Sequence, residues 1–163
     1  MCGWRQIIKK DLLGIPRCGI IGFHPTMLPK GRGPAPIINT ILEGSPDSGV
    51  TLYYISEGLN DGDIIGQKSF IVDPDDYAID IYQKVTSAGK YLVRKYFPEI
   101  ASGTAPRITQ NFSEISYFPK RSMEDNYIHI NSDSMDTIYQ KIRAFSKPYN
   151  GAYLVEKGKR LII

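Results

Sequence analysis

Apolar and polar positions alternate along the first half of the chain in short runs that predict strands. The run at 19–23 is apolar, is bounded by glycines and predicts a buried strand. Residues 50–55 are mostly β-branched or aromatic and predict a second strand, and residues 64–72 predict a third. Because only the polar turn 56–63 separates the second strand from the third, we expect these two to pair as a hairpin.

Apolar residues that recur at helical spacing predict the helices. The longest expected helix begins at 73–76 and ends at Pro98 and the stretch 103–106, because proline and glycine interrupt helices. Ser132 is the expected cap of the last helix. The other predicted helical segments are 9–14, 37–42 and 135–145.

The pattern is less regular from Arg107 onward. It predicts a short extended piece at 114–118 and a charged turn at 120–125. Two apolar runs around a Lys-Gly turn predict a final hairpin at 152–163.

The composition is typical of a water-soluble globular domain, with 163 residues, 42% of them hydrophobic and 23% charged. The net charge of +3 is mild, and we expect the basic run at 157–160 to be a solvated surface rather than a nucleic-acid contact. Cys2 and Cys18 show no CxxC spacing and no secretory leader precedes them, which favours free thiols in a reducing cytoplasm. No apolar run approaches the ~20 residues of a membrane-spanning helix.

The stretch 19–36 carries the clearest functional pattern. His24 stands where a strand ends and a rigid loop begins, which is where ligands bind in open α/β sheets. Arg32 stands between two glycines, and its planar guanidinium is expected to have a clear path to an anion. Prolines and glycines restrict the loop to one shape: Pro25, Pro29, Pro34, Gly31 and Gly33.

This stretch resembles the HPxxLPxxRGxxP signature of folate-dependent formyltransferases, the family that holds methionyl-tRNA, glycinamide ribonucleotide and nucleotide-sugar formyltransferases. Ordered matches continue along the chain. Residues 48–65 resemble the family's G-V-T and G-L-D-x-G-x-I segments, and residues 3–8 resemble the end of the preceding strand. Residues 117–121 and 142–153 resemble the link to a C-terminal domain.

The resemblance implies an α/β fold in three parts. These are an N-terminally incomplete, Rossmann-like formyltransferase catalytic domain at 1–110, a linker with a helix at 111–150, and the start of a barrel-like C-terminal β domain at 151–163. A family member would carry further residues ahead of Met1, with the first strands of a parallel sheet and part of the folate pocket. On this interpretation the chain is a fragment, a shortened gene product or a member that relies on a partner.

The resemblance also implies a reaction, the transfer of a formyl group from 10-formyltetrahydrofolate to a primary amine. This reaction needs an acid/base group, a hydrogen-bond donor for the oxyanion and a partner that orients the base. The family supplies them as Asn-x-His and an Asp. His24 matches the histidine, Gly22 stands at the asparagine position, and Asn60 stands at the Asp position with Asp61 next to it. The catalytic candidates are therefore His24, Asn60 and Asp61.

The same comparison gives the binding candidates. It places folate contacts at Trp4, Leu28, Gly62 and Asp63, and acceptor contacts at Arg32 and Gly33.

Structural alternatives stay open for several of these residues. His24 has the alternative of a structural histidine, Arg32 of a surface arginine and Trp4 of a core residue, while Asp61 and Asp63 are common turn formers. No metal is expected, because the acidic residues at 61–76 lack a histidine at useful spacing and the EF-hand pattern is absent.

Among acceptors, the sequence favours the amino sugar of a nucleotide-sugar. The turn at 120–125 resembles the Arg-x-x-x-Asp link of the sugar enzymes, and strong basic patches for tRNA are lacking. Methionyl-tRNA formylation is the alternative activity, with tRNA as partner. Gly22 and Asn60 favour a third interpretation, a catalytically inactive binding or regulatory module. The expected location is cytoplasmic, away from membranes, and a homo-oligomer is compatible with this assignment.

Overall fold

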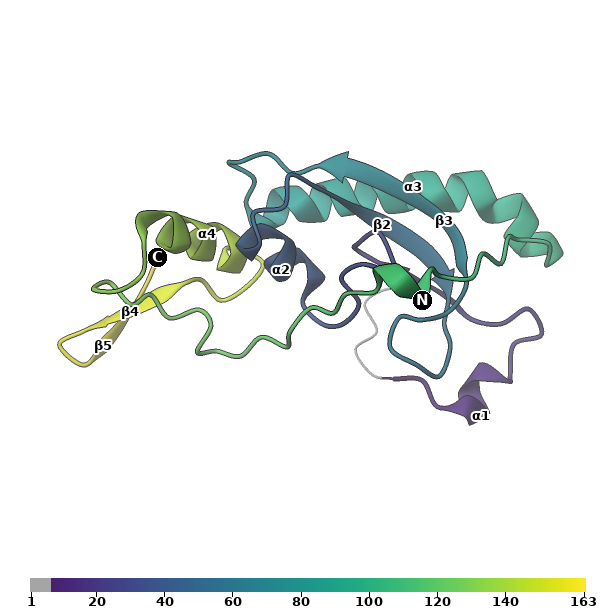
Figure 1. The fold of residues 1–163 in the computed structure, drawn as a ribbon, viewed down its shortest axis with the longest axis horizontal. Coiled ribbons are helices and arrows are strands. Elements are labelled where there is room, and N and C mark those ends of the chain that lie inside the picture. The colour runs from purple at the N-terminus through teal and green to yellow at the C-terminus, as the bar shows by residue number, and fades with distance from the viewer. Residues whose placement is uncertain (1–6) are drawn as a thin grey trace.

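The computed structural model describes residues 7–163, and a three-stranded sheet lies at its centre (Figure 1). The strands are β1 (Ile21–His24), β2 (Asp47–Tyr54) and β3 (Ile64–Ile71). They lie in the order β1-β2-β3, and both pairings are antiparallel. The three predicted strands and the hairpin formed by the second and third are confirmed. The parallel strands that the family resemblance implies are not among the described strands.

Four α-helices and a short 3₁₀ helix accompany the sheet in the described part of the chain. Each of the four predicted helical segments is confirmed as a helix, although several ends differ by a residue or more and the long helix begins at Ala78 rather than at 73–76. The bounds are α1 (Lys10–Leu13), α2 (Pro36–Leu42), α3 (Ala78–Ser102), η1 (Phe112–Glu114) and α4 (Met135–Phe145).

Of the two predicted ends of the long helix, Pro98 is wrong and the stretch that begins at Gly103 is confirmed. Helix α3 continues past Pro98 to Ser102, and its cap is Gly103 with a φ of 76°. Pro98 removes one N–H donor from the last turns, but the Gly103 N–H still donates to the Ile100 carbonyl. The left-handed backbone at Gly103 is what stops the helix.

The cap predicted for the last helix is also corrected. Ser134, not Ser132, precedes α4, and its Oγ accepts from the Thr137 N–H at 3.1 Å. The Ser132 N–H donates to the His129 carbonyl, so Ser132 belongs to the preceding turn. Similarly, the extended piece predicted at 114–118 is confirmed only after η1 ends at Glu114.

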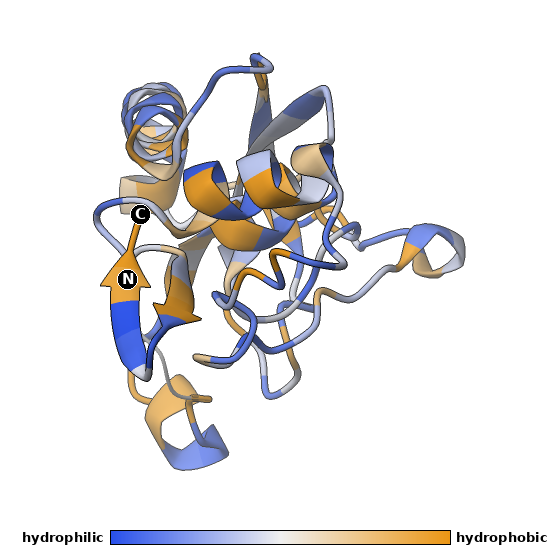
Figure 2. Ribbon diagram, turned by 90° about the vertical axis from the view of Figure 1, so that its left-hand side faces the viewer, coloured by the Kyte–Doolittle hydropathy of each residue, from blue (hydrophilic) through white to orange (hydrophobic). Residues whose placement is uncertain are grey.

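Two apolar clusters hold the elements together. One fills the space between the sheet and α3, and the other joins α2, α3 and α4. Helix α3 turns its hydrophilic side outward and its hydrophobic side toward the rest of the molecule (Figure 2). The fully or nearly fully buried residues of the first cluster are Val50, Leu52, Tyr54, Ile65, Ala88, Leu92 and Ala105.

The chain after α3 returns along the side of the sheet that faces away from this helix and then reaches α4 (Figure 1). It ends in the predicted hairpin, β4 (Tyr153–Glu156) and β5 (Lys159–Ile162), which are paired antiparallel. Because this hairpin is a two-stranded sheet, a barrel-like domain stays a prediction. No helix between residues 7 and 163 is both long and apolar enough to cross a membrane.

Candidate active site

His24 is the last residue of β1, and its ring lies inside the protein. The residue is only 5% exposed, and its Nε2 lies 2.8 Å from the carbonyl oxygen of Gly31. Since a carbonyl only accepts, this bond places the ring proton of the neutral imidazole on Nε2 and leaves the lone pair on Nδ1. The imidazole is therefore enclosed rather than open to solvent, because the loop that follows β1 folds back over the ring.

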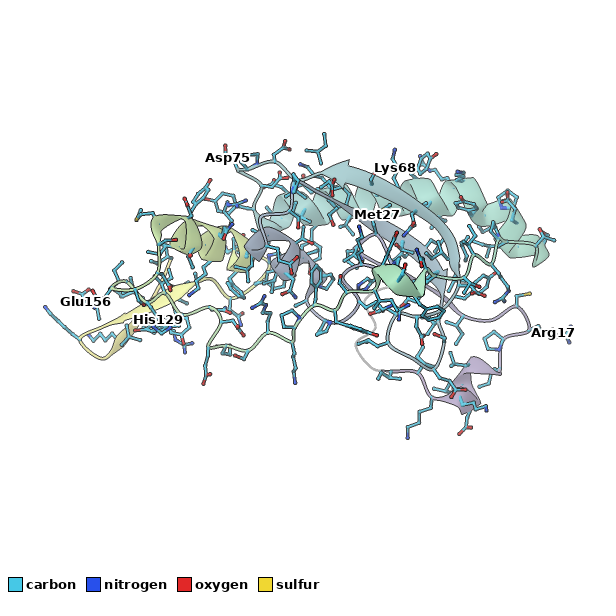
Figure 3. All side chains as sticks on the ribbon, viewed as in Figure 1. Arg17, Met27, Lys68, Asp75, His129 and Glu156 are labelled. Atoms are coloured by element: carbon cyan, nitrogen blue, oxygen red, sulfur yellow. The ribbon has the colours of Figure 1, made fainter. Side chains whose placement is uncertain are left out.

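Hydrogen bonds to the sheet hold this loop in place. Thr51 of β2 donates from its Oγ1 to the Thr26 carbonyl at 2.7 Å and accepts from the Leu28 N–H at 3.0 Å. The Gln67 side chain of β3 donates to the Leu28 carbonyl at 2.7 Å. Met27 of the same loop lies over the sheet, whereas His129 lies at the other end of the molecule beside the β4–β5 hairpin (Figure 3).

The loop residues 31–33 run beside the returning chain. Arg32 and Tyr117 form an isolated bridge in which the Arg32 N–H donates to the Ser116 carbonyl and the Phe118 N–H donates to the Arg32 carbonyl. Gly33 has a φ of 110°, and a Cβ there would lie 2.9 Å from the Phe118 carbonyl oxygen. This close approach of two backbones explains why position 33 requires a glycine.

The Arg32 guanidinium is more enclosed than the sequence suggested. The residue is 3% exposed, and its Nε and Nη2 donate to Oε1 of Gln110 at 3.2 and 2.7 Å. The alternative of a surface arginine is wrong for the same reason. Nη1 forms no hydrogen bond with any residue in the described range.

Gln110 is a site residue that sequence reasoning missed. It is 3% exposed, and its Nε2 donates to the Asn60 and Gly62 carbonyls at 2.9 and 2.8 Å while its Oε1 accepts from Arg32. One amide thus joins the loop after β1 to the β2–β3 turn. In the sequence, Gln110 is one glutamine in an irregular segment, where no periodic pattern indicates which residues it contacts.

Asn60 lies beside the same loop, and Asp61 points elsewhere. Asn60 has a φ of 53°, its Oδ1 accepts from the Gly33 N–H at 2.9 Å, and its Nδ2 donates to the Tyr53 hydroxyl at 2.8 Å. Asp61 is exposed and accepts a hydrogen bond from the Ser56 hydroxyl. The structure therefore brings His24, Arg32, Gly33 and Asn60 together around residues 31–33, without Asp61.

The folate candidates are spread around this network. Leu28 is 3% exposed and packs with Tyr53 and Ile64. Gly62 and Asp63 lie in the turn that Gln110 holds, where Asp63 accepts from the Thr109 hydroxyl at 3.3 Å. Trp4 lies outside the described residues.

With the geometry described, comparison with known proteins decides the family. A sequence profile described as Formyl transferase matches residues 1–96. The bifunctional polymyxin resistance protein ArnA of Wigglesworthia glossinidia brevipalpis is 35% identical over 162 residues, which are 98% of this chain and 24% of that protein. The methionyl-tRNA formyltransferase of Lysinibacillus sphaericus (strain C3-41) is 34% identical over 148 residues, covering 91% of this chain and 47% of that enzyme. The chain belongs to the formyl transferase family.

A solved formyltransferase shares its mixed α/β fold. The N-formyltransferase of Helicobacter canadensis, in complex with folinic acid and dTDP-3-aminofucose, superposes with a TM-score of 0.73 and 30% identity over 88% of this chain and 53% of that one. The chain spans about half the length of the curated methionyl-tRNA formyltransferases it matches.

The environment of His24 also sets its charge. Burial, which is only partly offset by the bond to Gly31, lowers the pKa of His24 below its usual value of 6.5. The imidazole is therefore neutral at pH 7 and has a lone pair on Nδ1 that can take up a proton.

Other polar clusters lie away from this loop. A groove of about 540 Å³ between β3 and α3 is lined by Lys68, Asp73, Asp76 and Lys84 among others. Lys84 donates to both Asp73 and Asp76 at 2.5 Å, so both carboxylates are paired with this one ammonium group. Within residues 7–163, no group of three or more His, Cys, Asp or Glu side chains is placed to hold a metal ion.

Proposed function

We propose that this chain takes part in formyl transfer from 10-formyltetrahydrofolate to a primary amine, with His24 as the acid/base. The observation that carries the proposal is the neutral His24 imidazole, oriented by Gly31 through Nε2, in a loop that Asn60 holds at Gly33. A neutral imidazole can take a proton from the attacking amine, since the unprotonated form of His24 prevails at pH 7.

The remaining candidates divide into positioning and binding roles. Asn60 fixes the loop through its amide, and Asp61, being exposed beside it, is the alternative carboxylate partner. We propose that Leu28, Gly62, Asp63 and Trp4 contact the folate. Arg32, whose Nη1 is uncommitted among the described residues, contacts a phosphate of the acceptor with Gly33 beside it.

An amino sugar carried by a nucleotide is the acceptor we favour. The Arg-x-x-x-Asp link is ordered, because Arg121 pairs with Asp125 at 3.3 Å and its Nε donates to Asn39 of α2 at 2.7 Å. A hydrogen bond from the Ser122 backbone, the largest influence, holds the pKa of Asp125 below its usual value. The solved relative from Helicobacter canadensis binds dTDP-3-aminofucose, which supports the same acceptor class.

Methionyl-tRNA formylation is the second candidate. It is favoured by the 34% identity to the Lysinibacillus sphaericus enzyme. The two acceptors differ in charge, so tRNA binding would weaken steeply with salt and nucleotide-sugar binding only weakly.

The test is a transfer assay with the purified chain. It is incubated with 10-formyltetrahydrofolate and either a dTDP-amino sugar or methionyl-tRNA, and release of tetrahydrofolate is followed. We expect release with the amino sugar and none with His24→Ala. Release with tRNA alone would favour the second candidate. Absence of transfer with both acceptors, with folate still bound, would favour the inactive binding module.

A further inference from the structure

Tyr53 stands directly across the sheet from Gly22. The pairing of β1 with β2 sets Gly22 opposite Tyr53 and His24 opposite Thr51. Residues paired across two strands share a face of the sheet, as do residues two apart on one strand. Tyr53 and His24 therefore lie on the same face, and Gly22 brings no side chain to it.

The Tyr53 hydroxyl is held at a defined place on this face. Tyr53 is 6% exposed, and its oxygen accepts from Nδ2 of Asn60 at 2.8 Å. Because the oxygen is the acceptor in this bond, the phenolic proton is available for a second partner. None of the described residues accepts it.

The other polar groups nearby are largely committed to the loop. Thr51 Oγ1 donates to the Thr26 carbonyl and accepts from the Leu28 N–H and from Gln67 at 2.9 Å. Gln67 Nε2 donates twice, to Leu28 and Thr51. Besides Arg32 Nη1 in the loop and the second N–H of Asn60, the Tyr53 O–H is a donor without an acceptor among residues 7–163, and it lies on the face that holds His24.

Resting on the proposed function, we propose that Tyr53 is a catalytic residue whose O–H donates a hydrogen bond to the formyl oxygen as that oxygen becomes negative. It would take the place of the side-chain donor that Gly22 lacks. A preorganised donor at a developing oxyanion is among the largest contributions to acyl-type transfer. Asn60 then has a second task, which is to orient the Tyr53 hydroxyl.

The step balances as follows. The amine lone pair forms the N–C bond to the formyl carbon, and the C=O π pair moves to the oxygen, where the Tyr53 O–H binds it without giving up its proton. His24 Nδ1 takes a proton from the amine. The C=O bond then re-forms, the bond from the formyl carbon to the folate nitrogen breaks, and that nitrogen receives the proton from His24.

The protonation state of Tyr53 fits this role. Burial, which is partly offset by the Asn60 hydrogen bond, raises the pKa of the Tyr53 hydroxyl above its usual value. The phenol therefore keeps its proton at pH 7 and remains a donor.

Tyr53→Phe tests the inference, because it removes the hydroxyl and keeps the ring. We expect kcat to fall about 100-fold with an unchanged KM for the acceptor, which is the signature of a bond to the formyl group that becomes stronger in the transition state. Tyr54→Phe is the matched control, since Tyr54 is the next residue of β2 but packs in the cluster between the sheet and α3. It should keep wild-type kcat.

A binding measurement separates this inference from the proposed function. The wild-type chain should bind 10-formyltetrahydrofolate more tightly than tetrahydrofolate, and Tyr53→Phe should lose that preference while still binding tetrahydrofolate. If the wild-type chain turns over and the Tyr53→Phe variant is equally active, only the role of Tyr53 is overturned. If the wild-type chain does not turn over but still binds 10-formyltetrahydrofolate more tightly than tetrahydrofolate in a way that depends on Tyr53, only the proposed reaction is overturned. Failure of the wild type to bind either folate overturns both.

Discussion

The two faces of the same sheet are built by different chemistry. Toward α3, the strand β2 presents Val50, Leu52 and Tyr54, which are buried among apolar side chains. Toward the loop after β1, the alternate residues Thr51 and Tyr53 are equally buried but form hydrogen bonds. Apolar contact dominates the face toward α3, whereas the other face combines a small apolar cluster with polar groups whose positions are specified by their partners.

This difference explains why the site lies where it does. Apolar packing tolerates substitution of similar volume, whereas a buried hydrogen-bond network allows little displacement of its members. We call the face toward the loop after β1 the network face and the opposite one the apolar face. The network face can hold His24 and Asn60 in fixed positions because the apolar face, packed against α3, supplies much of the stability. The four predictions below test this division, starting with the largest expected effect.

Leu52→Ala should damage the apolar face most. Leu52 is fully buried, so the loss of its side chain leaves a cavity and should lower the free energy of unfolding by about 3–5 kcal/mol in denaturant titration. Leu59→Ala is the matched control, because Leu59 is 43% exposed. Equal losses in the two variants would contradict the assignment of the core.

Gln110→Leu should break the network face. It leaves the Arg32 guanidinium and the Asn60 and Gly62 carbonyls without their buried partner, and we expect a loss of about 2–3 kcal/mol in unfolding free energy. Folate binding should be weakened even under conditions where the variant is fully folded. Gln83→Leu, on the exposed side of α3, should change neither quantity. A Gln110→Leu variant with wild-type binding would show that the network does not shape the site.

Thr51→Val keeps the shape of a residue on β2 but removes its hydroxyl. Three hydrogen bonds to the loop and to Gln67 are lost, so the unfolding free energy should fall by about 1–2 kcal/mol. Amide hydrogen exchange at Leu28 should become faster, since its N–H loses its acceptor. Thr86→Val, on the exposed side of α3, is the control. Unchanged exchange at Leu28 would argue against Thr51 as the anchor of the loop.

The pH dependence of stability should show the smallest effect. Because the folded-state pKa of His24 lies below 6.5, the unfolded chain binds more protons as the pH falls through that value, and the unfolding free energy decreases toward acid. His24→Gln should flatten this part of the profile, while His129→Gln, at the other histidine of the chain, should retain it. A profile unchanged by His24→Gln would show that burial does not perturb this ring.

Local patterns in the sequence were sufficient for most of the elements. Alternation and helical spacing predicted the strands and helices, because these signals arise from which face of an element is buried. The errors in the predicted helices lie at their first and last residues. Pro98 could be accommodated near the last turns of α3. The choice between Ser132 and Ser134 depends on which hydroxyl accepts from the Thr137 N–H in the first turn of α4.

The motif around His24 and Arg32 identified the family, since the order of residue types along a loop is visible in one dimension. It also singled out Gly22 and Asn60 as departures from the family pattern, but it did not show what stands beside them. That Arg32 is enclosed by Gln110, and that Asn60 meets the Tyr53 hydroxyl, depends on contacts between residues far apart in the chain.

The sequence by itself determined most of the strand and helix content, the family, and the choice of candidate site residues, because each of these follows from local periodicity or from an ordered motif. Only the tertiary structure decided that the His24 ring is buried and neutral, that Gln110 joins two loops, and that Tyr53 faces Gly22. The register of β1 on β2 sets Tyr53 opposite Gly22, and register depends on the packing of the whole sheet rather than on any single segment. The other two features depend on contacts between segments that are far apart in the chain.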